Sequence, residues 1–360
     1  MRAVVTGGAG FIGSHLVDLL IGRGWSVTVL DSLDGRVHGD SAPDLAAGAE
    51  LVRGDIRDAD SVDKALRPGA DAVFHQAAMV GVGRGEADSR EYHDVNVRGT
   101  TVLLDALAAL EGVPPRLVLA SSMAIYGEGA YRCPTCREER KARRKKEHLD
   151  RGEWEPRCQT CDAALEPIPA TESHPQRPAT GYARSKALQE SESMARGREL
   201  GIPVVALRYH NVYGARMPRD TPYAGVASIF RSRLADGKSP VVHEDGGQLR
   251  DFIRVEDVAR CNLLAAEAPV EMVRYETFNV ATGQPRTIMA LASSLCRSMS
   301  SGILPTLSNS YREGDPRHII ASPAKARRLL GFEASIWFDE GVERFSRESL
   351  RAPPREVVVC

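Results

Sequence analysis

Thr6-Gly7-Gly8-Ala9-Gly10-Phe11-Ile12-Gly13 is the stretch that decides the fold, because four glycines there join an apolar run to a helix-forming one. Residues 3–6 are typical of a buried strand, and leucines recur at helical spacing within residues 11–22. The glycines of this pattern allow a tight turn, close approach of a pyrophosphate and close packing of helix on strand. The stretch therefore predicts a phosphate-binding turn that opens a βαβ unit.

Short apolar runs alternate with amphipathic stretches along the first part of the chain. Parallel strands are expected at residues 3–6, 26–30, 72–74, 116–120 and 204–209. Helices are expected at residues 11–22, 96–110, 182–200 and 323–330. The alternation indicates right-handed crossovers, and hence an α/β fold with a Rossmann-type doubly wound parallel sheet.

The composition is that of a globular protein with balanced charge. The chain has 360 residues, with 47 lysines and arginines against 48 aspartates and glutamates, so no net charge points to nucleic acid or an anionic membrane. It lacks the run of about 18 apolar residues that a membrane span needs and any secretory signal pattern. We therefore expect a soluble, cytoplasmic protein that binds neither nucleic acid nor membrane.

Asp31 ends the second expected strand, 18 residues after Gly13. A carboxylate at this place accepts hydrogen bonds from the adenosine ribose of a dinucleotide and repels a 2′-phosphate, so NAD is favoured over NADP. Arg36 is close enough in the sequence to keep NADP open. The alternative is an ordinary glycine turn followed by a capping aspartate.

The composition and hydrophobic pattern of the chain divide it into four parts. Residues 129–171 are rich in Arg, Lys and Glu, hold two cysteine pairs and lack a long apolar period, which indicates an insertion. The expected parts are an NAD-binding domain at 1–128 and 172–212, this insertion, a smaller α/β substrate-binding domain at 213–350 and a tail at 351–360.

Four further motifs accompany the glycine turn. They are Ser121-Ser122-Met123-Ala124-Ile125-Tyr126-Gly127, Tyr182-Ala183-Arg184-Ser185-Lys186, Leu207-Arg208-Tyr209-His210-Asn211-Val212-Tyr213-Gly214 and Arg250-Asp251-Phe252-Ile253. Together they resemble the extended short-chain dehydrogenases/reductases, in the branch of nucleotide-sugar epimerases and dehydratases. The resemblance covers nearly the whole chain except residues 129–171.

Tyr182 and Lys186 form the candidate catalytic pair. Spaced at i and i+4, they lie on one face of a helix, where the ammonium is expected to lower the pKa of the phenol. Tyr182 can then take a proton from a sugar hydroxyl while hydride leaves the same carbon for the nicotinamide. The resemblance adds Ser122 as a hydrogen-bond partner of the reacting oxygen. The alternative is an amphipathic tyrosine beside a solvated lysine.

Two positions after Ser122 separate the reaction types of this branch. Dehydratases carry an Asp-Glu pair there and decarboxylases a glutamate, whereas this chain has Met123 and Ala124, which transfer no proton. Epimerisation at carbon 4 through a keto intermediate is therefore expected. A net reductase or dehydrogenase of keto-sugar nucleotides and a non-catalytic nucleotide-binding scaffold stay open.

The resemblance also implies residues that contact each ligand. The cofactor set is Gly7, Gly10, Phe11, Ile12, Gly13, Asp31, Ser32, Asp55, Ile56, Gln76, Ala77, Ala78, Asn96, Tyr182, Lys186 and Tyr209. The substrate set is Met123, Asn211, His243, Arg250 and Arg312, of which Asn211 and the two arginines match positions that hold the diphosphate of a nucleoside-diphosphate sugar. His243 stands where relatives stack an aromatic ring on the base, and His75 is either a packing residue or a contact.

The identity of the sugar is suggested by two local features. Epimerases of UDP-glucuronate usually show threonine at the Asn211 position and an arginine at the place of Pro218, so a neutral or deoxy sugar is favoured. Residues 221–226, with the paired cysteines, are similar to bacterial dTDP-L-rhamnose 4-epimerases. UDP-glucuronate and UDP-hexoses stay as alternatives, and a homodimer is usual in the family.

The insertion carries Cys133, Cys136, Cys158 and Cys161 as two C-x2-C pairs separated by 21 residues. This spacing predicts a structural, tetrahedral zinc site, with a redox pair and unligated thiols as alternatives. Residues 137–146 include seven basic residues, which favours a solvated helical face over a nucleic-acid arm. Because the insertion precedes Tyr182, we hypothesise that it covers the substrate cleft or contacts a partner subunit.

Overall fold

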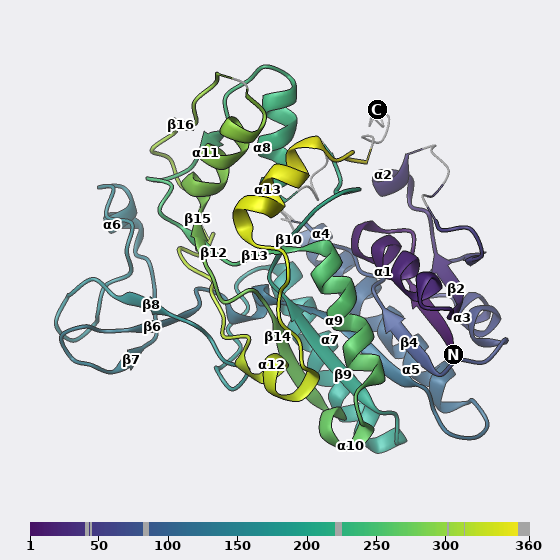
Figure 1. Ribbon diagram of the computed structural model, residues 1–360. Coiled ribbons are helices and arrows are strands. Elements are labelled where there is room, and N and C mark those ends of the chain that lie inside the picture. Colours follow the sequence, from purple (N-terminus) through teal and green to yellow (C-terminus); the bar gives the residue numbers. More distant parts are fainter. Residues whose placement is uncertain are drawn as a thin grey trace.

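A seven-stranded parallel sheet forms the centre of the molecule (Figure 1). The computed structural model describes residues 1–39, 43, 45–81, 86–219, 225–300, 302–312 and 314–351. The strand order is β14-β9-β5-β4-β1-β2-β3. The strands are β1 (Arg2–Thr6), β2 (Ser26–Asp31), β3 (Glu50–Arg53), β4 (Ala72–His75), β5 (Arg116–Ser122), β9 (Val204–Tyr209) and β14 (Glu276–Val280).

Helices cover both faces of this sheet because its strands are buried on both sides. Along β1, Ala3 and Val5 pack into one apolar layer and Val4 into the other. The first layer is completed by α1 (Phe11–Gly22), α9 (Val255–Glu267) and α12 (Ala324–Leu330). The second is completed by α3 (Ala59–Leu66), α5 (Gly99–Ala108) and α7 (Gly181–Leu200). The predicted doubly wound α/β fold is confirmed.

One helix beside the sheet and one strand within it differ from the sequence expectation. The helix expected from residue 96 begins earlier, as a π-helical turn η1 (His93–Arg98) that continues into α5 and follows α4 (Glu86–Tyr92). Strand β3 gave no apolar signal because it is an edge strand with three of its four side chains exposed. The remaining short elements here are α2 (Gly35–His38), the 3-10 helix η2 (Met123–Tyr126) and α10 (Val270–Val273).

The expected substrate-binding domain at 213–350 is divided in the structure. Its segments α9, β14 and α12 return to the sheet, where Val258, Phe278 and Ala326 share the first apolar layer. What remains is a separate lobe, the substrate lobe, with an apolar cluster of its own. It consists of α8 (Val226–Ala235), α11 (Ile288–Ser298), α13 (Phe338–Arg347) and the strand pairs β10 (Asn211–Tyr213) with β13 (Phe252–Arg254), β11 (Val241–Val242) with β16 (Thr306–Leu307), and β12 (Leu249–Arg250) with β15 (Arg286–Thr287).

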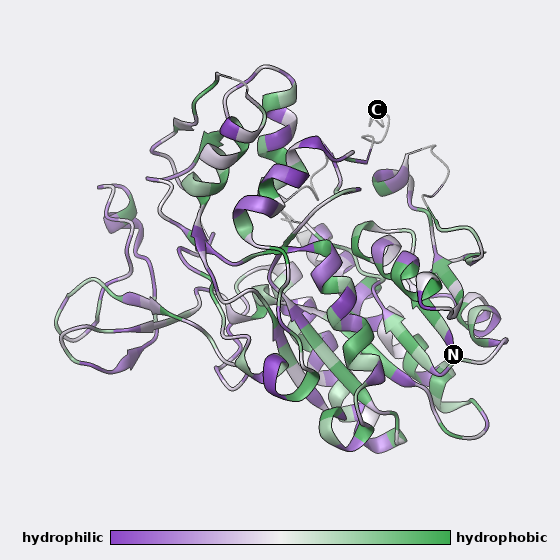
Figure 2. Ribbon diagram, in the orientation of Figure 1, coloured by the Kyte–Doolittle hydropathy of each residue, from purple (hydrophilic) through white to green (hydrophobic). Residues whose placement is uncertain are grey.

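The insertion projects from the rest of the molecule as a small antiparallel unit (Figure 1). It contains β6 (Ala130–Arg132), β7 (Glu139–Arg140), α6 (Lys146–Leu149) and β8 (Glu166–Ile168). Its apolar cluster is limited to Tyr131, Ala142, Leu165 and two cysteines, with Cys136 and Ala163 packed against them. Most of its ribbon is hydrophilic, in contrast to the sheet (Figure 2). Such a unit has too little core to be stable without further cross-links.

The end of the described chain returns to the start of the fold. The backbone N–H of Arg351 donates to the carbonyl of Met217 at 3.0 Å, and its Nη2 donates to the carbonyl of Ala9 at 2.7 Å. Residues 352–360 of the expected tail lie outside the described residues, as do residues 221–224 of the stretch that suggested the sugar. Within the described residues no helix is long and apolar enough to cross a membrane.

Candidate active site

The glycine turn between β1 and α1 has the close contacts that its sequence predicts. Gly7 has φ +68°, and a Cβ there would lie 2.5 Å from the backbone nitrogen of Ala77. A Cβ on Gly13 would lie 2.1 Å from the carbonyl oxygen of Gly7. Only glycine fits at either position, so the N-terminus of α1 can approach a phosphate closely.

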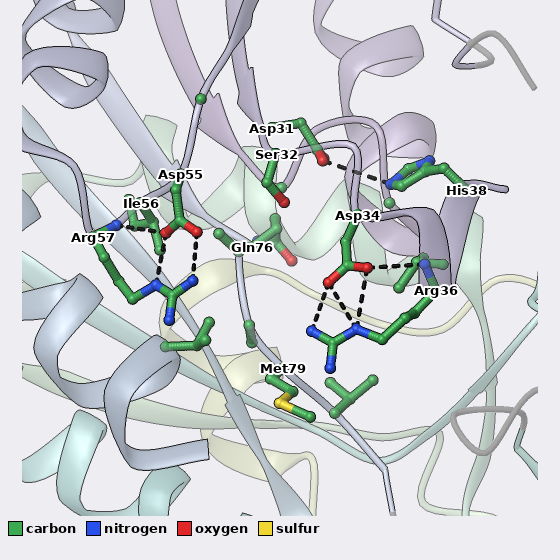
Figure 3. Close-up of a pocket in the computed structure, with 18 residues that line it drawn as sticks. Asp31, Ser32, Asp34, Arg36, His38, Asp55, Ile56, Arg57, Gln76 and Met79 are labelled. Carbon is green, nitrogen blue, oxygen red and sulfur yellow. Dashed lines mark hydrogen bonds and ion pairs between the residues drawn. The ribbon is translucent and has the colours of Figure 1, made fainter. Parts of the chain in front are cut away.

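A cavity of about 170 Å³ lies beside this turn at the carboxyl ends of β1, β2 and β4 (Figure 3). Asp31 at its edge accepts hydrogen bonds from the backbone N–H of Ala9 at 3.0 Å and of Leu33 at 2.9 Å. These bonds fix the carboxylate next to the glycine turn. The predicted cofactor residues that line this cavity are Gly7, Gly10, Asp31, Ser32, Asp55, Ile56, Gln76, Ala77 and Ala78.

Arg36, the residue that left NADP as an alternative, already forms ion pairs with two carboxylates. The Arg36 guanidinium pairs with Asp34 at 2.6 Å and with Glu91 at 2.7 Å (the Asp34 contact is drawn in Figure 3). These two carboxylates raise the pKa of Arg36 and leave it little capacity for a 2′-phosphate. Together with Asp31, this pairing fits NAD.

A second cavity, of about 350 Å³, holds the predicted catalytic residues. It shares Gly7, Gly10, Gln76 and Ala78 with the first, so one dinucleotide can extend through both. The other predicted residues that line it are Phe11, Ile12, Gly13, Ser122, Met123, Tyr182, Lys186, Tyr209 and Asn211. None of the described residues that line this second cavity is an aspartate or a glutamate.

Helix α7 positions the catalytic tyrosine one residue after its start. The Thr180 side chain caps the helix by accepting a hydrogen bond from the backbone N–H of Ala183 at 3.1 Å. The ring of Tyr182 packs edge-on against Tyr92, with centroids 5.8 Å apart. Ser122 is near enough to this hydroxyl to favour the ionised phenol and lower its pKa. The contact of Ser122 with the reacting substrate oxygen, which the resemblance implies, stays a prediction.

The expected effect of Lys186 on Tyr182 is absent from this structure. Burial raises the pKa of Tyr182, and only the hydrogen bond with Ser122 opposes that shift. The reason is the direction of the lysine: its Nζ donates to the carbonyl of Ala120 at 2.6 Å and to the side chain of Gln189. Burial lowers the pKa of Lys186 to about 7. The ammonium is thus held at the end of β5 instead of against the phenol.

Two neighbouring side chains of this cavity have polar atoms without partners. Both ring nitrogens of His210 and the Oδ1 of Asn211 are buried and have no hydrogen-bond partner. His210 is 4% exposed, and burial lowers its pKa to about 3, so the ring is neutral. Buried polar atoms are normally satisfied, so this pair indicates a place for a polar ligand. The resemblance singled out Asn211 as a diphosphate contact and expected His210, with Tyr209, to approach the nicotinamide.

Tyr209 is held by a residue that the sequence did not indicate. Its hydroxyl bonds with the side chains of Gln76 at 3.2 Å and Asn262 at 2.8 Å. Asn262 lies on α9, far from every motif, and no pattern in the sequence marks it. These bonds fix the wall shared by the two cavities.

Five other singled-out residues line neither cavity. Asn96 uses its amide to hold Met79 and Ser185, and His75 is buried among threonines and Gln189. His243 contacts two serines, Arg250 donates to the carbonyls of Leu249, Pro316 and Arg317, and Arg312 is exposed. Asn96 and Arg250 therefore position backbone segments in this structure, and the predicted direct contacts of these residues stay predictions.

The four cysteines of the insertion come together. Their Sγ atoms all lie within 4.8 Å of one another, with separations of 3.5 Å for Cys133–Cys161, 3.6 Å for Cys136–Cys161 and 4.0 Å for Cys136–Cys158. A tetrahedral zinc with bonds of about 2.3 Å places its sulfurs roughly 3.8 Å apart. A disulfide would need about 2.0 Å. The residues present therefore fit a zinc ion.

The two cysteine pairs also share one turn geometry. The residue after each pair, Arg137 or Asp162, has φ +58° and donates its backbone N–H to the carbonyl of the first cysteine. The Cys136 N–H points at the sulfur of Cys133 at 3.3 Å. Two matched turns that direct four thiols to one point are a donor arrangement suited to a metal.

Comparison with known proteins identifies the family. The model of the "NAD dependent epimerase/dehydratase family" matches residues 3–147 and 160–281. A putative UDP-glucose 4-epimerase of Methanocaldococcus jannaschii is 33% identical over 95% of this chain and 96% of its own, and the dTDP-L-rhamnose 4-epimerase of Burkholderia thailandensis is 30% identical over 95% and 93%.

Solved structures agree with these relatives. UDP-glucose 4-epimerase of Thermotoga maritima with UDP-glucose has a TM-score of 0.79 at 29% identity, covering 96% of this chain and 97% of that chain. The Thermus thermophilus UDP-glucose 4-epimerase in complex with NAD has a TM-score of 0.77 at 31% identity, covering 96% and 98%. The fold, the glycine turn and the matches over most of the chain show that this protein belongs to the NAD dependent epimerase/dehydratase family.

Proposed function

We propose that this protein is an NAD-dependent 4-epimerase of nucleoside-diphosphate sugars. The observation that carries the proposal is the catalytic cavity itself: Ser122 and Tyr182 line it together, next to the cavity at the glycine turn, while Met123 and the other described lining residues supply no carboxylate. Loss of water or carbon dioxide would need such an acid or base. Oxidation and reduction of one carbon need only Tyr182 as the group that takes and returns the proton, with NAD as the hydride acceptor.

Each residue of the cavity then has a role. Ser122 and Tyr182 hold the oxygen on carbon 4, and Tyr182 takes its proton and returns it to the new hydroxyl. NAD supplies the hydride acceptor when it is bound. Lys186, fixed by Ala120, orients the cofactor, and the unpaired atoms of His210 and Asn211 hold polar groups of the ligands.

For the substrate we propose dTDP-L-rhamnose or a related neutral or deoxy sugar nucleotide. Support comes from the relative that acts on dTDP-L-rhamnose and from the apolar side chains of Met123, Met217 and Phe252 in the cavity wall. UDP-hexoses and UDP-glucuronate are the alternatives, because relatives with those substrates share the fold.

The test is to incubate the purified protein with UDP-, dTDP-, GDP- and ADP-sugars without added cofactor and to follow the sugar ring by NMR. A stereoisomer at carbon 4 that reaches the same ratio from either side is expected. Net formation of oxidised or reduced sugar, with a matching change in nicotinamide absorbance, would contradict an epimerase and indicate the reductase or dehydrogenase.

We also propose a structural zinc ion at Cys133, Cys136, Cys158 and Cys161. All four thiolates would be ligands, leaving no position for substrate, so zinc would hold the insertion folded. One zinc per chain by metal analysis is expected, and its loss in Cys136→Ser but not in Cys261→Ser tests the assignment. The homodimer and the cytoplasmic location stay predictions, tested by light scattering and by cell fractionation.

A further inference from the structure

A third cavity, of about 530 Å³, separates the insertion from the rest of the molecule. One wall is formed by residues 124–129 and 177–183, and a second by residues 141–149 of the insertion. A third is formed by Tyr311, Gly314, Asp315, Pro316 and Ile319. The function proposed above assigns no ligand to this cavity. Its size is within the range of small-molecule sites.

This cavity lies against the catalytic one. Met123 and Tyr182 line the catalytic cavity, while their neighbours Ala124 and Ala183 line the third cavity. A substrate whose sugar lies at Tyr182 therefore has this cavity beside it.

The charges around the cavity are strongly unbalanced. Its lining includes Lys141, Arg143, Arg144, Lys146 and Arg177, against only Glu128 and Asp315. Arg144 pairs with Glu244, and Lys146 pairs with Asp150.

Three of these cations have no partner. Within the residues that the structure describes, the side chains of Lys141, Arg143 and Arg177 make no hydrogen bond or ion pair, and the Asp315 carboxylate makes none with them. Unpaired cations from two different walls of one cavity favour an anionic ligand.

The insertion wall is fixed in place by contacts with the substrate lobe. Arg144 bonds with Glu244 at 2.6 Å, and both side chains are almost completely buried. On the other side of the cavity the Tyr311 hydroxyl donates to Asp150 at 2.6 Å.

A second group of contacts joins the same two parts. Glu155 of the insertion pairs with Arg317 at 2.7 Å and with His318 at 2.8 Å. These contacts hold the insertion wall against the wall that carries Tyr311, so the backbone that bears Lys141 and Arg143 is fixed beside the cavity.

We propose that this cavity binds an anionic group of the nucleotide-sugar substrate through Arg143, Lys141 and Arg177. The inference rests on the proposed function and adds a binding role for the insertion. The anion is either the diphosphate of the nucleotide or a carboxylate on the sugar, since a guanidinium recognises both.

The experiment compares Arg143→Gln, Arg177→Gln and the double variant with Lys145→Gln, an exposed lysine of the insertion that does not line the cavity. Affinities for UDP, UDP-glucose and UDP-glucuronate are measured by calorimetry, and KM and kcat are measured with the substrate found in the NMR test. We expect each single cavity variant to weaken affinity about 5- to 20-fold, as for loss of a charged hydrogen bond, with kcat and bound NAD unchanged and Lys145→Gln like the wild type.

The ligands separate the two sources of the anion. Weaker binding of all three ligands assigns the cations to the diphosphate, and weaker binding of UDP-glucuronate alone assigns them to a sugar carboxylate. An active enzyme whose double variant keeps wild-type affinity for all three overturns the inference but leaves the proposed function intact. A wild type that converts no nucleotide sugar overturns the proposed function instead.

Discussion

The parallel sheet and the insertion are two regions of one chain that are stabilised in different ways. The sheet has an apolar layer on each face, and the strand Val204–Tyr209 contributes to both. The insertion has one small apolar cluster around Tyr131, four thiols that lie close together and ion pairs with Glu244 and Arg317. The two regions should therefore respond to different perturbations, although their cavities are adjacent.

Replacing Tyr182 by phenylalanine should have the largest effect on activity, and it acts on the sheet region alone. The change removes the proton-transferring hydroxyl but keeps the ring against Tyr92, so we expect kcat to fall by about 10²–10⁴-fold with Tm and zinc content unchanged. Turnover measured by NMR checks this. Tyr275→Phe, at a hydroxyl outside the cofactor and catalytic cavities, is the control. Full activity in Tyr182→Phe would show that the Tyr182 and Lys186 pair does not act in the mechanism.

Removing the proposed metal should affect the insertion and leave the sheet folded. Without zinc the 129–171 unit lacks a sufficient core, so the third cavity loses a wall and we expect KM to rise by about 10- to 100-fold, the worth of one or two charged contacts. Limited proteolysis should then cut within residues 137–147, while the main thermal transition persists. Loss of the main transition on chelation would show that the regions are not separable.

Asp31→Asn should weaken cofactor retention without touching the insertion. The amide oxygen keeps one of the bonds from Ala9 and Leu33 but has no charge for a ribose hydroxyl, so we expect NAD affinity to fall about tenfold. Equilibrium dialysis of the apo protein measures it. Asp63→Asn, at an exposed position on α3 that lines neither cavity, serves as the control. Equal NAD affinity in wild type and Asp31→Asn would contradict the assigned role.

Lys186→Met should change the pH dependence of stability. The folded-state pKa of Lys186 is about 7, whereas an unfolded lysine has about 10.4. Between these values the unfolded chain binds more protons, so this lysine makes stability rise with pH. The variant should lose that rise, which is at most about 5 kcal/mol over the whole interval between the two pKa values.

Urea midpoints from about pH 7 to about pH 9 measure this slope. Lys145→Met, at an exposed position, is the control and should keep the wild-type slope. An unchanged slope in Lys186→Met would show that the lysine is not desolvated in solution.

Local patterns in the sequence predicted most of the sheet and half of the site. The glycine turn, Asp31 and Tyr182 could be found because their roles depend on neighbours in the chain or on helical spacing, whereas Ser122 was implied by the family resemblance. Contacts between distant segments left no such signal.

Three residues show what was missed. The bond from Lys186 to Ala120, the carbonyl contacts of Arg250 and the support of Tyr209 by Asn262 each join segments at least 50 residues apart. The same limit explains the domain division, because nothing local to β14 shows that it extends the sheet beside β9.

The contact between Arg351 and Ala9 joins the last described residue to the glycine turn, 342 positions earlier in the sequence. We expect this bond to hold the end of the chain against the turn and so to slow the departure of a dinucleotide bound there. An enzyme that restores its oxidised cofactor within every turnover loses no speed through such confinement. A dehydrogenase, which must exchange its cofactor in each cycle, would be slowed by the same bond.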